Sequence, residues 1–105
     1  MAAAILPKQY ELSIVIIGDK ESRRLNKTHH HRGKVANILS FPLSKEEGEL
    51  FLNPTEARRD APRFGFSEKK MLHFLVIHGL LHLKGHRHGA TMSQAENKLL
   101  KRFSA

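Results

Sequence analysis

The sequence predicts a small single domain of the α/β class with an α+β layout. Two observations lead to this class: short apolar runs rich in β-branched residues lie in the first half of the chain, and one long helical segment without proline lies in the second half. The length of 105 residues suits one domain, since a chain of this size buries only about 60 to 70% of the surface that its unfolded form exposes. We therefore expect a single domain over residues 1–105 with a modest core.

The first half is expected to contain three strands, at Tyr10–Ile17, Val35–Phe41 and Glu49–Leu52. The first strand is apolar enough on both faces to be the central one. Pro42 is expected to end the second strand, which could form a hairpin with the third. A basic helix is expected from Asp19 to about Thr28. The segment 55–66 has proline and glycine too close together for a long helix, so it is expected to be a loop with room for one helical turn from Pro54.

The second half is dominated by one helix that begins after Ser67, a suitable N-cap residue, and ends at Gly85. Apolar residues cover nearly its whole circumference, so we expect a buried central helix. A capping-box pattern at Thr91 predicts a further helix to about Phe103.

Charge and cysteine content restrict the function classes. Eighteen Lys and Arg against ten Asp and Glu give a net charge of +8, which favours a polyanionic partner such as nucleic acid. The absence of cysteine excludes disulfides, iron–sulfur clusters, thiolate zinc sites and cysteine nucleophiles. No segment approaches the roughly 18 consecutive apolar residues of a membrane span, and the N-terminus lacks the features of a signal peptide, so we expect a cytoplasmic protein with no membrane partner.

Histidine spacing on the long helix predicts a metal site. His78 and His82 are about 40° apart around the helix and one turn apart along it. Gly85 can turn the chain so that His88 approaches the same point, and three neutral imidazoles leave one position of a tetrahedral zinc open. An isolated histidine pair is often incidental, but imidazoles on an apolar helix need partners, which a metal supplies. Metzincin proteases share this spacing; here Gly79 occupies the position of their general base, which disfavours peptide hydrolysis.

These histidines lie in a segment that carries a family resemblance. His78–His88 resembles the H-G-x-L-H-L-x-G-(Y/H)-D-H signature of the YbeY family, and Leu25-Asn26, Arg32–Lys34, Asn37–Pro42 and Gly48–Leu50 resemble further segments of that family in the same order. The family comprises single-domain, zinc-dependent, single-strand-specific endoribonucleases of rRNA maturation and ribosome quality control. The resemblance implies a small mixed sheet packed with helices, in which the buried central helix carries the metal motif.

The resemblance also implies roles for individual residues. His78, His82 and His88 would bind one zinc ion per chain, and Arg32 matches the arginine implicated in RNA cleavage. A guanidinium can hold a phosphate with two hydrogen bonds and stabilise its transition-state charge. The implied partners are single-stranded RNA, especially ribosomal RNA, and the ribosome. Three arginines of the 55–66 segment would guide the RNA backbone: Arg58, Arg59 and Arg63.

Departures from the family pattern leave two alternatives open. Arg87 replaces the aspartate that precedes the last histidine, and Val35-Ala36 replaces more polar residues. The alternatives are a metal-stabilised ribosome assembly factor that binds RNA without cutting it, and a metallohydrolase of a substrate other than nucleic acid. Four further histidines are expected to be non-ligands, three of them in an exposed turn near Arg32: His29, His30, His31 and His86.

Overall fold

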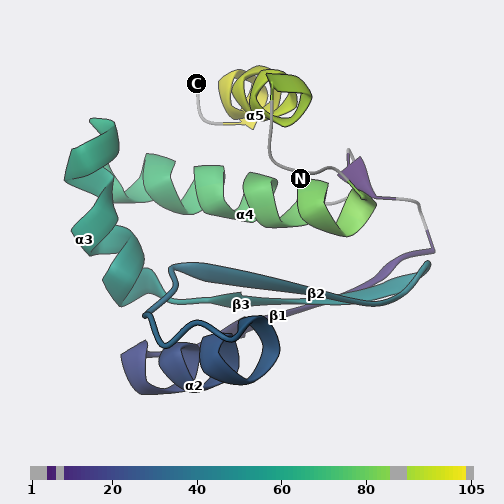
Figure 1. Ribbon diagram of the computed structural model, residues 1–105. Helices are drawn as coiled ribbons and strands as arrows, with labels where there is room; N and C mark the ends of the chain where they lie inside the picture. The colour runs from purple at the N-terminus through teal and green to yellow at the C-terminus, as the bar shows by residue number, and fades with distance from the viewer. Residues whose placement is uncertain (1–4, 7–8, 86–89, 104–105) are drawn as a thin grey trace.

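A computed structural model describes residues 5–6, 9–85 and 90–103. Its elements are β1 (Glu11–Ile16), α2 (Asp19–His30), β2 (Ile38–Ser44), β3 (Glu47–Leu52), α3 (Pro54–Phe64), α4 (Glu68–Lys84) and α5 (Ala90–Phe103). Figure 1 shows α4 across one face of the sheet, α2 beneath the opposite face, α5 on the far side of α4, and α3 at one end. This arrangement confirms the predicted α+β layout. None of the helices in the described ranges combines the length and the apolar character needed to cross a membrane.

The three-stranded sheet has the order β1-β3-β2, so β3 is the central strand. It pairs in parallel with β1 and forms the expected antiparallel hairpin with β2. Leu50 and Leu52 of β3 are buried, whereas Ile14 and Ile16 of β1 are 48% and 63% exposed. The prediction that the first strand is central was therefore wrong. Its β-branched residues favour an extended backbone, but this preference does not specify burial on both faces.

Strand β2 continues through Pro42, contrary to the expectation that this proline would end it. β2 lies at an edge of the sheet, and its register with β3 shifts between Pro42 and Ser44. An edge strand with an irregular register tolerates a residue that has no backbone N–H to donate.

Helix α3 occupies most of the segment that was expected to be a loop. The side chain of Asn53 accepts a hydrogen bond from the backbone N–H of Glu56 at 3.3 Å, and Pro54 takes the first helical turn, where a missing N–H costs nothing. Gly65 ends the helix with a φ of 69°. Ala57 and Ala61 are buried against α4, and this packing supports a helix in spite of Pro62 in its last turn.

Helix α4 has the ends that the sequence predicts. The hydroxyl of Ser67 accepts a hydrogen bond from the N–H of Lys70 at 3.1 Å, and Gly85 closes the helix with a φ of 107°. Gly79 lies against the sheet: a Cβ there would be 2.8 Å from Leu50 Cδ2 and 3.0 Å from Ile38 Cδ1. Only glycine allows α4 to approach β2 and β3 this closely, directly beside His78.

Replacing Gly79 with alanine is expected to destabilise the protein by about 1 kcal/mol in urea unfolding. Overpacking against the buried Leu50 costs about 1–3 kcal/mol, and the better helix propensity of alanine returns about 1 kcal/mol of it. Gly33→Ala is the control, because no atom lies within 4 Å of the position of its Cβ and Gly33 lies outside the helices. Equal stability of Gly79→Ala and wild type would contradict the close packing.

Candidate functional site

Two histidines of α4 point their ring nitrogens at each other. Nε2 of His78 and Nε2 of His82 are 3.0 Å apart, and the two rings meet edge to face with centroids 4.6 Å apart. Both side chains are partly buried and line a cleft of about 760 Å³. The predicted spacing thus brings the two imidazoles close enough to bind one metal ion together.

Glu96 of α5 holds the other nitrogen of His78. Its Oε1 is 2.5 Å from Nδ1 of His78, and the glutamate is only 8% exposed. A carboxylate at this distance accepts the proton of Nδ1, so that Nε2 is the nitrogen that can act as an acceptor or metal ligand. Sequence reasoning missed this residue. The sequence spacing could have revealed it. Glu96 lies four residues from both Met92 and Leu100, so it shares the buried apolar face of α5 with them, and a buried carboxylate needs a partner.

The described residues present two of the three predicted ligands. The predicted third ligand, His88, lies outside the described residues, as do His86 and Arg87. Among the described residues, no group of three or more His, Cys, Asp or Glu could hold a metal ion. His78 and His82 nevertheless fit part of a zinc site. Two nitrogens converge, and a buried carboxylate orients one ring as in known metal-ligating histidines.

Arg32 lines the same cleft. It follows α2, where His31 closes the helix in the left-handed conformation with a φ of 56°. The N–H of Arg32 donates to the carbonyl of Asn26 at 3.2 Å, and Nδ2 of Asn26 donates to the carbonyl of Lys34 at 3.0 Å. Asn26 therefore anchors the backbone on both sides of the arginine, whose exposed side chain borders the cleft together with His78 and His82.

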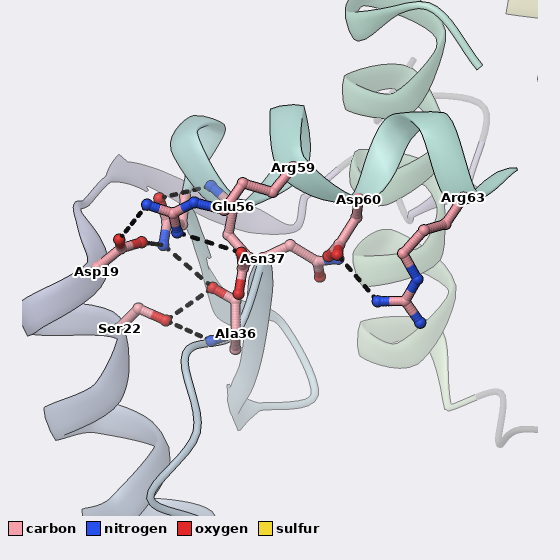
Figure 2. A network of polar contacts seen from close by, with 9 residues as sticks. Asp19, Ser22, Ala36, Asn37, Glu56, Arg59, Asp60 and Arg63 are labelled. Atoms are coloured by element: carbon pink, nitrogen blue, oxygen red, sulfur yellow. Dashed lines mark hydrogen bonds and ion pairs between the residues drawn. The ribbon is translucent and has the colours of Figure 1, made fainter. Parts of the chain in front are cut away.

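A polar network anchors the far end of the Arg32 segment (Figure 2). The hydroxyl of Ser22 donates to the carbonyl of Ala36 at 2.7 Å and accepts from its N–H at 2.8 Å. Asp19 accepts a hydrogen bond from Nδ2 of Asn53 at 2.9 Å and pairs with Arg59 at 2.8 Å. These contacts join α2, the segment before β2 and α3. They therefore determine where the segment 31–37 lies relative to the cleft.

The three arginines predicted to guide RNA lie in α3 and are paired with carboxylates. Arg58 contacts Glu68 at 3.1 Å, Arg63 contacts Asp60 at 3.2 Å, and Arg59 belongs to the network of Figure 2. None of the three lines the cleft. The structure therefore does not bring them together with Arg32 and the histidine pair, and their contact with RNA stays a prediction.

The histidines before Arg32 form the end of α2 instead of a separate turn. His29 and His30 are in its last turn, and both rings pack on Phe41, with centroid distances of 4.8 and 5.5 Å. His30 also lines the cleft, whereas His29 does not.

Comparisons with known proteins agree with this fold and motif order. The family model described as Endoribonuclease YbeY matches residues 2–104. An endoribonuclease YbeY of Lacticaseibacillus casei is 33% identical over 96 residues, which cover 79% of this chain and 63% of that protein. The Aquifex aeolicus endoribonuclease YbeY is 36% identical over 84 residues, which cover 74% of this chain and 56% of the relative. A solution structure from Thermotoga maritima superposes with a TM-score of 0.64 at 25% identity, covering 88% of this chain and 67% of the other.

The site and fold are those of a small α+β protein with a paired-histidine cleft. The chain belongs to the YbeY family. It spans less than two thirds of the length of the Lacticaseibacillus casei relative.

Acid is expected to weaken the network of Figure 2 through Asp19. Hydrogen bonds from Arg59 and Asn53 lower the pKa of this carboxyl below its ordinary value of 3.8. A lowered folded-state pKa stabilises the protein above the pKa of the unfolded state, and this stabilisation is lost as the pH falls through the folded value. The stability difference between wild type and Asp19→Asn should therefore be full above pH 3.8 and shrink below it. Urea unfolding across this range measures the difference, and a gap that does not vary with pH would contradict the role of Asp19.

Proposed function

We propose that this chain is a zinc-dependent endoribonuclease that cuts single-stranded RNA in ribosomal RNA maturation and ribosome quality control. The observation that carries the proposal is the cleft that Arg32, His78 and His82 line together. Relatives described as endoribonucleases support an RNA substrate, and the net charge of +8 supports a polyanionic one. The ribosome as partner and the cytoplasm as location belong to the same proposal.

His78, His82 and His88 are the proposed ligands of one zinc ion per chain. When bound, zinc supplies a Lewis acid and a water of lowered pKa. Glu96 keeps the proton of His78 on Nδ1, so that Nε2 points toward His82 with its lone pair available. The sequence departs from the family by placing Arg87 where a carboxylate is usual, and Glu96 supplies a buried carboxylate to the histidine pair from α5.

Arg32 is the proposed phosphate-binding residue. Its guanidinium can donate two parallel hydrogen bonds to the scissile phosphate and stabilise the charge that develops there. Asn26 holds the backbone at Arg32 and so keeps the base of this side chain beside the cleft. Arg58 and Arg63 are exposed enough to add weaker contacts along the RNA backbone.

Loss of either described ligand is expected to abolish metal binding. Wild type should hold about one metal ion per chain, and His78→Ala and His82→Ala should lose it and melt at a lower temperature, because a bound metal stabilises the folded state. Glu96→Gln should weaken metal affinity by about 10- to 100-fold through the orientation of His78. Metal analysis and competition with a chelating dye measure these effects.

His29→Ala is the control for these variants, because His29 lies outside the cleft and should keep wild-type metal content. Full metal content in both ligand variants would show the ligand assignment to be wrong.

Arg32 is expected to matter for cleavage and not for metal binding. Arg32→Ala should keep its metal content and melting temperature while the cleavage rate falls by about 10²- to 10³-fold, the usual loss when one transition-state donor is removed. Arg32→Lys should recover only part of the rate, because an ammonium cannot make the planar two-pronged contact. Single-turnover cleavage of a labelled single-stranded RNA, with metal measured in the same samples, tests both variants.

The same experiment separates the nuclease from the assembly factor. Wild type that is fully metallated, binds the RNA and cuts no faster than Arg32→Ala would reject the nuclease proposal in favour of a factor that binds RNA without cutting it.

A further inference from the structure

Phe64 is an exposed aromatic ring at the cleft. It is the last residue of α3, it is 48% exposed, and it lines the same cleft as Arg32 and His78. The neighbouring rings of Phe66 and Phe74 pack against both core clusters, whereas Phe64 belongs to neither. An isolated apolar residue on an ordinary surface needs no explanation. A ring that contributes little to the core and borders the candidate site is placed to contact a ligand.

A series of rings connects Phe64 with the histidine pair. The ring centroids of Phe64 and Phe74 are 5.6 Å apart, and those of Phe74 and His78 are 6.0 Å apart. Phe66 supports Phe64 from the side at 5.7 Å. Phe64 is therefore held by other rings beside the cleft, while about half of its own surface stays open for stacking.

Positive charge accompanies these rings. The ammonium of Lys70 lies 4.6 Å from the centre of the Phe66 ring, and Arg32 borders the cleft on the side of α2. Aromatic rings beside cationic side chains are the combination by which proteins bind single-stranded nucleic acid, since the rings stack on bases and the cations contact phosphates.

We propose that Phe64 is a stacking platform for one nucleobase of a single-stranded RNA whose phosphate is held at Arg32. This inference rests on the proposed function and adds a base-binding subsite to it. Stacking on one ring tolerates any base, so the subsite selects unpaired nucleotides and not a particular sequence. Bases within a duplex stay stacked on their neighbours and are unavailable to such a ring.

The test compares two labelled RNAs of equal length, one with all its bases and one with abasic riboses throughout. Every protein also carries His82→Ala, which removes a proposed metal ligand but keeps Arg32, so that the RNA stays intact during fluorescence anisotropy measurements. Phe64→Leu keeps an apolar side chain against Phe66 and Phe74 but removes the ring. It should bind the base-bearing strand about 5- to 100-fold more weakly and the abasic strand unchanged. The salt dependence should stay the same, because phosphate contacts are kept.

Two further variants complete the experiment. Phe64→Trp restores a larger ring and should recover the affinity for the base-bearing strand. Leu43→Ala is the matched control: Leu43 is 54% exposed and lies outside the cleft, so its loss should change neither affinity.

Three outcomes would overturn the subsite. One is equal binding of the base-bearing strand by Phe64→Leu and its parent, another is equal weakening for both strands, and the third is a change of oligomeric state in Phe64→Leu without any loss of RNA affinity. Parallel cleavage assays on protein with His82 intact keep the two proposals apart. If that protein cuts RNA while Phe64→Leu shows one of these outcomes, only the subsite is wrong; if it neither binds nor cuts RNA, the proposed function fails as well.

Discussion

The close approach of α4 to the sheet at Gly79 is the constraint on which the rest of the structure depends. At this point the backbone of α4 packs directly on side chains of β2 and β3, because Gly79 has no side chain of its own, and the core divides along the helix into two clusters. Ile77 and Leu80 belong to one cluster, and Met71 and Leu75 belong to the other. A small protein has a small, closely packed core, so a shift of α4 would disturb both clusters together. His78 precedes Gly79 directly, and its position is therefore set by the same contact.

The candidate site is assembled from groups that lie far apart in the sequence. α4 supplies the histidine pair, the segment that follows α2 supplies Arg32, and α5 supplies Glu96. Each of these groups is held by a different kind of contact: close packing for the histidines, backbone and side-chain hydrogen bonds through Asn26 for the arginine, and burial on an apolar face for the glutamate. Rigid placement from several elements is what a site needs to hold a charged group at a defined distance.

Patterns of local origin were predicted well. The ends of α4 at Ser67 and Gly85 follow from capping chemistry that involves only a few neighbouring residues, and the convergence of His78 and His82 follows from helical geometry. The hairpin of β2 and β3 and the basic helix α2 were also predicted. Predictions that depended on packing between elements far apart in the sequence were wrong. The helix at α3 depends on burial of two alanines against α4, and the edge position of β1 depends on which strand pairs twice.

The sequence by itself determined the fold class, the family and three residues of the cleft, Arg32, His78 and His82, because spacing along a helix and the order of short motifs are properties of the chain alone. The tertiary structure decided which polar groups meet. Glu96 reaches His78 only because α5 packs on α4, and Arg59 of α3 pairs with Asp19 only because the fold brings these two side chains together at the start of α2. The sequence does not show whether a charged side chain is exposed to solvent or paired with another side chain. Its role is settled by the long-range packing that brings the partner within hydrogen-bonding distance.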